Sequence, residues 1–245
     1  MPFFERPSPN FNARALPVRH TVVHYTGMKS RDEALQRLCD PAAKVSAHYL
    51  IDQEGAVFRL VPEDQRAWHA GVAYWRGERD INSSSVGIEL CNPGHDWGYR
   101  AFPAPQLAAL KDLLAGIFPR YGLSADALLG HSDIAPSRKL DPGELFPWRH
   151  FAESGFGLWP EDAAPVAGHA DLTGALRRLS EIGYAVPTTP AEGSDILNAD
   201  SATTDVIKAF QRRYLPDQID GRLDTLTAAR IAAVAVACAL NRPVA

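Results

Sequence analysis

The residue pattern of this 245-residue chain changes near residue 160, and that change constrains the fold more than any other feature. Before it come short runs of β-branched and aromatic residues, and after it apolar residues recur at helical spacing. Between them lies PEDAAPVAGHA, a stretch of proline and small residues that is typical of a linker. We therefore predict two domains, residues 1–160 and 171–245, joined by a linker at 161–170. A chain of 245 residues is long enough for one medium-sized domain and one small domain.

The first domain is predicted to be α/β, with a mixed central β-sheet covered by helices, because strand-like runs are interspersed with helical ones. The strand-like runs are rich in β-branched and aromatic residues and lie at Thr21–Tyr25, Ala47–Asp52, Ala56–Val61 and Ser85–Cys91. The turn residues Gln53-Glu54-Gly55 join the middle two runs as a hairpin. Helices are expected at Arg31–Leu38 and from about Pro105 to Tyr121.

The second domain is predicted to be a small bundle of three helices. Leu172, Leu176 and Leu179 form one apolar stripe, and Val206, Phe210 and Tyr214 form a second. A third helix is expected to begin after Asp224, a good N-cap residue, and to end near Leu240. The three stripes are expected to share one core.

Composition argues against several functional classes. The formal net charge of −4 provides no basic surface for nucleic acid, and three scattered cysteines form no disulfide framework. The longest apolar run, Ile231–Leu240, is too short for a bilayer span, so no membrane partner is expected. The N-terminal residues lack the basic start and apolar core of a signal peptide. A cytoplasmic location is therefore expected, with the periplasm as the alternative if a leader has been removed.

The segment Gly130–Gly143, GHSDIAPSRKLDPG, carries the densest set of reactive side chains. It places His131, Asp133, Lys139 and Asp141 within eleven residues, and its prolines disfavour regular structure. The residue before a proline is extended, so Lys139 and Asp141 should project to one side. The alternative interpretation is a surface loop in which Asp133 caps a turn and Lys139 is solvated.

Glu89 is a charged residue within a strand-like run. In SVGIELC, residues 86, 88 and 90 share one face, so Glu89 lies on the other face beside Gly87. Burying an unpaired carboxylate costs several kcal/mol, so a buried Glu89 needs a cation, a polarised water or a substrate. The alternative is an edge strand on which Glu89 faces solvent.

Two histidines and a carboxylate indicate a metal site. His20 and His24 lie about 13 Å apart along a strand, so one zinc ion with bonds of about 2.0–2.1 Å binds at most one of them. His24, His131 and Asp141 would leave a zinc site with one open position and a net charge of +1. Glu89 could then act as general base and Lys139 could stabilise an oxyanion, which together describe a metal-assisted amide hydrolase.

The chain resembles the zinc-dependent N-acetylmuramoyl-L-alanine amidases of the amidase-2 family, and within it the AmiD/AmpD branch. Six motifs in order carry the resemblance over about residues 5–160: VVHYTG, SAHYLID, VPEDQRAWHAG, INSSSVGIELCNPG, GHSDIAPSRKLDPG and LFPW. The PSPNFNAR opening is similar as well, and AFQRRYLPDQIDGRLDTLTAA (209–229) is similar to a peptidoglycan-binding module. The resemblance implies one Zn²⁺ per chain on His24, His131 and Asp141, with Glu89 and Lys139 as catalytic residues.

The implied reaction cleaves the amide between N-acetylmuramic acid, including its 1,6-anhydro form, and the L-Ala of a stem peptide. A zinc-bound water attacks this bond, and muropeptides or peptidoglycan fragments from recycling are the expected partners. Substrate contacts are expected from residues of the AWHAG and YWRGERDIN segments, for which ordinary packing is the alternative: Trp68, His69, Trp75, Arg79 and Asn82. Two other functions stay open, an exported hydrolase of polymeric peptidoglycan and a non-catalytic muropeptide sensor; the oligomeric state is open too.

Overall fold

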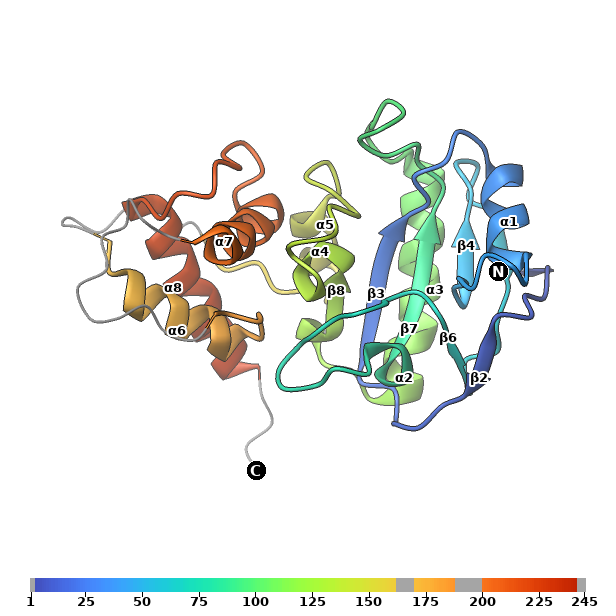
Figure 1. The fold of residues 1–245 in the computed structure, drawn as a ribbon, viewed down its shortest axis with the longest axis horizontal. Coiled ribbons are helices and arrows are strands. Elements are labelled where there is room, and N and C mark those ends of the chain that lie inside the picture. Colours follow the sequence, from blue (N-terminus) through green and yellow to red (C-terminus); the bar gives the residue numbers. More distant parts are fainter. Residues whose placement is uncertain (1–2, 162–169, 188–199, 242–245) are drawn as a thin grey trace.

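The computed structural model describes residues 3–161, 170–187 and 200–241. Its central feature is a six-stranded sheet with the spatial order β1-β5-β4-β7-β3-β8 (Figure 1). The strands are β1 (Phe3–Glu5), β3 (His20–Tyr25), β4 (Tyr49–Ile51), β5 (Val57–Arg59), β7 (Ser85–Leu90) and β8 (Leu128–Gly130). The predicted mixed sheet is confirmed. The four predicted strands form β3, β4, β5 and β7, of which β3 is one residue longer than predicted and the other three are shorter.

The strand directions place the ends of three strands together. β4 and β5 are antiparallel, as the predicted hairpin requires, and Gly55 makes its turn with a φ of +86°. The four adjacent strands β4, β7, β3 and β8 run parallel to one another. Because parallel strands end at the same edge, the carboxyl ends of β7, β3 and β8 lie side by side, where α/β sheets bind ligands.

One face of the sheet is covered by α3 (Ala104–Tyr121). Val86, Ile88 and Leu90 of β7 point to this face and are buried with Leu110 and Leu114 of the helix. The long predicted helix is therefore confirmed, and so is the alternation along β7. This packing leaves the side chain of Glu89 on the opposite face.

The opposite face is only partly covered by α1 (Arg31–Cys39). Leu35 and Leu38 of this helix are buried against Leu50 of β4. Leu50 is paired with Glu89 in the sheet, so α1 packs beside the position of Glu89. Around Glu89 of β7 and His24 of β3, this face opens into a cavity that can accommodate a polar site.

Smaller elements surround this face. β2 (Phe11–Ala13) and β6 (Gln65–Ala67) form a two-stranded antiparallel sheet, and α2 (Ile81–Ser84) leads directly into β7. A short 3₁₀ turn (Ala125–Ala127) precedes β8, which continues into α4 (His131–Ile134). The helix α5 (Trp148–Glu153) follows later in the chain.

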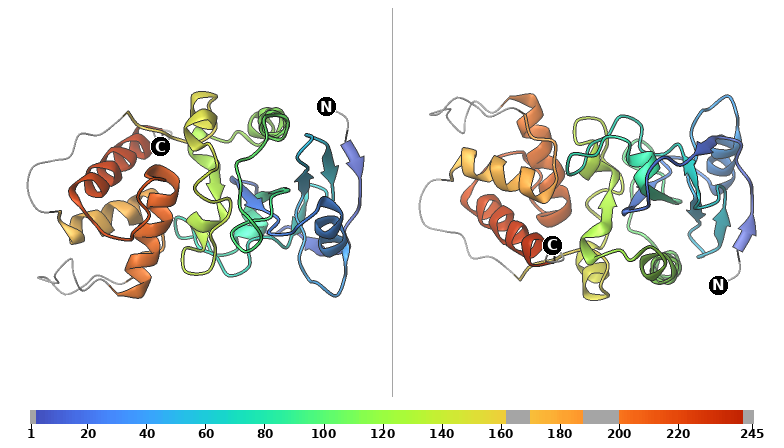
Figure 2. Two further views of the ribbon diagram at one scale, coloured as in Figure 1. Left: turned by 90° about the horizontal axis from the view of Figure 1, so that it is seen from above. Right: turned by 90° about the horizontal axis from the view of Figure 1, so that it is seen from below.

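Three helices form the C-terminal part, as predicted: α6 (Leu172–Ile182), α7 (Ser201–Tyr214) and α8 (Thr225–Leu240). They gather at one end of the molecule, beyond β8 (Figures 1 and 2). Asp224 caps α8 by accepting a hydrogen bond from the Thr227 N–H at 2.7 Å. Most of the predicted linker, residues 162–169, lies outside the described residues. In the described part of the chain, no helix combines the length and apolar character that crossing a bilayer requires.

The three helices share their core with the sheet. The predicted stripes are buried, and the same apolar cluster contains residues of α6, α7 and α8 together with Val22 of β3, Leu129 of β8 and Ile134 of α4. The apolar contact therefore crosses the predicted domain boundary, and the bundle does not complete its core alone.

A buried ion pair fastens α7 to α4. Arg213 Nη1 lies 2.6 Å from Asp133 Oδ2, and the two side chains are only 5% and 0% exposed. The Tyr184 hydroxyl donates to Asp133 Oδ1 at 2.7 Å, and the Gly130 N–H donates to Asp133 Oδ2 at 2.8 Å. Asp133 thus caps a turn, as the alternative interpretation of this segment supposed, but it does so in the interior.

We predict that Arg213→Met destabilises the protein by about 3–5 kcal/mol, because it leaves Asp133 buried without its partner. Urea unfolding followed by circular dichroism measures the loss. The control is Arg177→Met, which removes an exposed pair with Glu181 at 2.8 Å. Exposed pairs of this kind contribute about 0.3–0.5 kcal/mol, so a similar small loss in both variants would contradict the prediction.

Candidate active site

The register of the central strands brings three functional side chains together. His24 of β3 is paired with Glu89 of β7 on one side. On the other side Val23 is paired with Gly130, so His131 follows at the level of His24. These residues are 65 and 107 positions from His24 in the sequence. Only the parallel pairing of β7, β3 and β8 makes them neighbours.

Asp141 reaches the same place through the loop that follows α4. The chain leaves His131, makes the single turn of α4, and returns so that the Ser132 N–H donates to the Asp141 backbone oxygen at 2.8 Å. His131 and Asp141 are both buried. This loop is therefore part of the interior along much of its length and is not the solvated surface loop of the alternative interpretation.

Three donor atoms converge at this point. His24 Nδ1 lies 2.9 Å from His131 Nδ1 and 3.0 Å from Asp141 Oδ2, and His131 Nδ1 lies 3.0 Å from the same oxygen. Among the described residues, no fourth His, Cys, Asp or Glu joins this group. His20, at the other end of β3, is not part of it. The geometry suits one divalent cation with three protein ligands.

The electrostatics of the three residues also suit a cation. Burial, reinforced by His131, lowers the pKa of His24 to about 4, so this imidazole is neutral at pH 7. Burial alone would raise the pKa of Asp141, but the two adjacent imidazoles hold it well below its usual value. Metal ligands must be deprotonated, and both groups are in that state without any metal.

Glu89 presents an unpaired carboxylate beside this group. Its Oε2 is shielded from solvent and makes no hydrogen bond. Burial, and next the charge of Asp141, raise the pKa of Glu89 to about 8. A buried polar atom without a partner is costly, so the site is arranged for a group that Glu89 can contact.

A cavity of about 390 Å³ opens over these four side chains. The loop residues Arg138, Lys139 and Leu140 line one side of it, and residues of α1 line the other. Lys139 is half-buried and lines the cavity together with Glu89 and Asp141, and its positive charge acts to lower the pKa of Glu89 against the larger effect of burial. His95 also lines the cavity, and its Nδ1 lies 2.9 Å from the Tyr25 hydroxyl.

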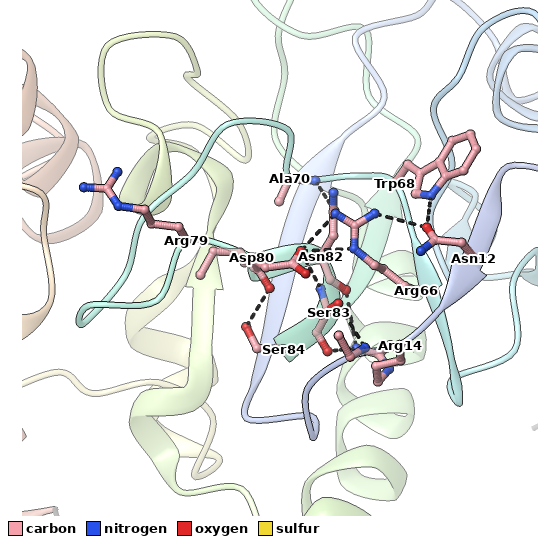
Figure 3. A network of polar contacts seen from close by, with 12 residues as sticks. Asn12, Arg14, Arg66, Trp68, Ala70, Arg79, Asp80, Asn82, Ser83 and Ser84 are labelled. Carbon is pink, nitrogen blue, oxygen red and sulfur yellow. Dashed lines mark hydrogen bonds and ion pairs between the residues drawn. The ribbon is translucent and has the colours of Figure 1, made fainter.

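Of the expected substrate-binding residues, only His69 lines the cavity. Trp68 is half-buried, and its indole N–H donates to Asn12 Oδ1 at 2.6 Å. Asn82 is buried, and its Oδ1 accepts from the N–H groups of His69 and Ala70 at 2.9 and 2.8 Å (Figure 3). Asn82 therefore holds the backbone of the AWHAG segment and does not itself face the cavity.

The structure does not bring Trp75 and Arg79 to the cavity. Trp75 is 3% exposed and packs edge-on against Tyr184, with ring centroids 5.1 Å apart. It belongs to the core shared with the C-terminal helices, so the alternative of ordinary packing applies to Trp75 and the expected substrate contact does not. Arg79 is exposed over the Tyr74 ring and points away from the other residues drawn in Figure 3.

Arg14 is a supporting residue that the sequence analysis did not single out. Its guanidinium donates to the backbone oxygens of Glu63 and Gln65 at 3.1 and 2.7 Å and to that of Ser85 at 2.9 Å. It thereby joins β6 to the start of β7. The guanidinium also donates to the backbone oxygens of Asn82 and Ser83 (Figure 3). The PSPNFNAR segment that contains it was part of the family resemblance, but nothing local indicated what it contacts.

Comparison with known proteins assigns the family. Residues 14–144 match the family described as N-acetylmuramoyl-L-alanine amidase. The amidase AmiD of Escherichia coli is 36% identical over an alignment of 235 positions that covers 86% of this chain and 80% of that protein. A structure of AmiD in complex with the substrate anhydro-N-acetylmuramic acid-L-Ala-D-γ-Glu-L-Lys aligns with a TM-score of 0.76 at 33% identity, covering 91% of each chain.

A second solved structure agrees with this assignment. AmpDH3 from Pseudomonas aeruginosa, in complex with anhydromuramic pentapeptide, aligns with a TM-score of 0.78 at 33% identity. The alignment covers 88% of this chain and 90% of that one. The chain thus belongs to the N-acetylmuramoyl-L-alanine amidase family.

Proposed function

We propose that this chain is a zinc-dependent enzyme that hydrolyses the amide bond between N-acetylmuramic acid and the L-Ala of the stem peptide. Its substrates include fragments that carry 1,6-anhydro-N-acetylmuramic acid and arise in peptidoglycan recycling. The observation that carries this proposal is the convergence of His24, His131 and Asp141 beside the unpaired carboxylate of Glu89 in one cavity. The anhydromuropeptides bound to AmiD and AmpDH3 support the substrate class.

The donor set favours zinc over other cations. Two imidazole nitrogens and one carboxylate oxygen are ligands that catalytic zinc sites use, with one further position open. Calcium and magnesium prefer sets of oxygen ligands, which this group does not offer. When bound, zinc lowers the pKa of a water molecule and polarises a carbonyl oxygen. One ion per chain is expected, because the described residues hold one such group.

Two residues of the chain supply the remaining chemistry. Glu89 takes the proton of the attacking water, because its carboxyl group lines the same cavity as the three donor residues and its Oε2 has no hydrogen-bond partner. Burial raises the pKa of Glu89, and a cation bound beside it would keep the carboxyl ionised so that it can accept that proton. Lys139 offers its ammonium group to the oxygen that becomes negative as the amide carbonyl is attacked. Both side chains line the cavity that also contains the three donor residues, so a bound amide can contact all of them.

The division into a catalytic domain at 1–160, a linker at 161–170 and a peptidoglycan-binding-like domain at 171–245 remains a proposal. The segment 209–229, which resembles a peptidoglycan-binding module, contains polar residues that hydrogen-bond to one another within the helical bundle. Gln211 Nε2 donates to Asp220 Oδ1 at 3.0 Å, and Gln211 Oε1 accepts from the Gly221 N–H at 2.8 Å. A glycan surface on this part would therefore use other residues.

The metal assignment predicts that Asp141→Ala weakens zinc binding by more than about 100-fold, which exceeds the 10- to 100-fold cost of altering an outer contact. Competition with a chromogenic chelator measures the dissociation constant. The control is Asp96→Ala, which removes the same charge from the cavity lining outside the donor group. Equal affinity in both variants would show that Asp141 is not a ligand.

The general-base role predicts that Glu89→Gln loses at least about 10²-fold in kcat and keeps one zinc per chain. Release of the L-Ala peptide from an N-acetylmuramoyl peptide reports turnover, and metal analysis reports zinc. Glu153→Gln, a change at an exposed residue of α5, is the matched control. Turnover close to the wild-type rate in Glu89→Gln would remove Glu89 from the mechanism.

The substrate class is tested by offering a soluble anhydromuropeptide and intact sacculi to the same enzyme. We expect L-Ala peptide to be released from the soluble substrate at an appreciable rate. Activity on sacculi alone would favour the exported wall hydrolase, and binding without release from either would favour the non-catalytic sensor. The cytoplasmic location expected from the sequence stays a prediction.

A further inference from the structure

The dipeptide His69-Ala70 contacts the outer nitrogen of both imidazoles in the donor group. His24 Nε2 lies 3.1 Å from His69 Nδ1, and His131 Nε2 lies 3.1 Å from the Ala70 backbone oxygen. All three rings are buried. One short segment, which follows β6 in the chain, thus contacts both histidines of the donor group on the side away from the cation position.

The direction of each hydrogen bond follows from one serine. The Ser85 hydroxyl donates to the Ile81 backbone oxygen at 2.5 Å, so its oxygen is left to accept from His69 Nε2 at 3.3 Å. His69 then carries its proton on Nε2 and has a lone pair on Nδ1. That lone pair accepts from His24 Nε2, which must therefore carry the proton of the neutral His24 ring.

The position of the proton on His131 Nε2 follows from its partner, the Ala70 backbone oxygen. A backbone carbonyl accepts hydrogen bonds and never donates them, so His131 Nε2 carries a proton toward the Ala70 oxygen. When a metal ion binds, both imidazoles therefore present Nδ1 as the ligand atom, and these two atoms lie 2.9 Å apart beside the Asp141 carboxylate. Three lone pairs directed at one point repel one another unless a cation lies between them.

We propose that His69 is a positioning residue that fixes the tautomer and the ring orientation of the zinc ligand His24. The inference rests on the proposed zinc site and adds a role for a residue that the sequence assigned to substrate binding. Outer hydrogen bonds of this kind orient metal-binding histidines and strengthen their basicity. Both ring nitrogens of His69 are engaged, by His24 and by Ser85, so neither is left to bind a substrate.

The surroundings of His69 are built to hold its ring in place. A Cβ atom at Gly87 would lie 2.4 Å from His69 Cγ, so the ring fills the space that the glycine leaves in the middle of β7. Asn82 Oδ1 accepts from both backbone N–H groups of the dipeptide (Figure 3). Asp80, which precedes Asn82 and caps α2, is in turn held by Arg66 at 2.9 Å.

The first test compares zinc affinity in two variants of His69. His69→Phe keeps a ring of similar size and removes both nitrogens, so we expect zinc to bind about 10- to 100-fold more weakly. His69→Asn places an amide oxygen near the position of Nδ1 and should recover most of the affinity. His150→Phe, on the exposed side of α5, controls for loss of a histidine elsewhere. Wild-type affinity in His69→Phe would overturn the proposal.

The second test needs no variant. In the zinc-loaded wild-type protein labelled with ¹⁵N-histidine, NMR should show a slowly exchanging proton on His24 Nε2 and none on Nδ1. A proton on Nδ1, with the metal on Nε2, would overturn the proposal whatever the variants do. If the wild-type protein binds no zinc at all, the proposed function itself fails, and this outcome is distinct from unchanged affinity in His69→Phe.

Discussion

The site depends on the parallel pairing of β3 with strands on both of its sides. Because β7 and β8 flank β3 in the same direction, Glu89 and His131 arrive on either side of His24 at the end of the sheet. A shift of one residue in either pair would turn the affected side chains to the face that α3 covers. The apolar packing of Val86, Ile88 and Leu90 against α3 opposes such a shift, so the core of the protein also sets the geometry of the site.

The loop that supplies the other ligands is held from two directions. From within the sheet domain, the Ser132 N–H links the segment of His131 to Asp141. From the C-terminal part, Arg213 of α7 and Tyr184, two residues after the end of α6, both contact Asp133, two residues after His131. The C-terminal part therefore helps to hold the segment that carries His131, and it also completes the apolar core. This gives it a role that is independent of any contact with glycan.

Much of the fold was predictable because its signals are local. The alternation in β7 and the long stripe of α3 each indicated the correct element and the correct buried face. β1 and β8 were not predicted, since each has only three residues and no alternation to detect. β8 forms a strand because it pairs with β3. The sequence of the β8 segment alone does not reveal this partner.

The site, too, contains residues that local sequence signals reveal and residues whose roles depend on distant parts of the chain. His24, Glu89, His131, Lys139 and Asp141 were identified because their types and the motifs around them indicate one chemistry, and the structure brings them to one cavity. Trp75 was expected at the substrate because an aromatic residue in a polar loop suits a sugar, yet Tyr184, over 100 residues later, covers its ring. The position of the His69 ring could not be predicted from its own segment either. The ring is held by a hydrogen bond to Ser85 and by the space beside Gly87, and both residues belong to another motif.

The proposed metal centre is one ion held by the Nδ1 atoms of His24 and His131 and a carboxylate oxygen of Asp141. A crystal structure of the zinc-loaded protein, with anomalous scattering recorded at the zinc edge, tests this most directly. We predict one anomalous peak bonded to His24 Nδ1, His131 Nδ1 and Asp141 at about 2.0–2.2 Å, with no fourth side chain attached. A peak elsewhere in the chain, or one with Glu89 as a ligand, would contradict the account.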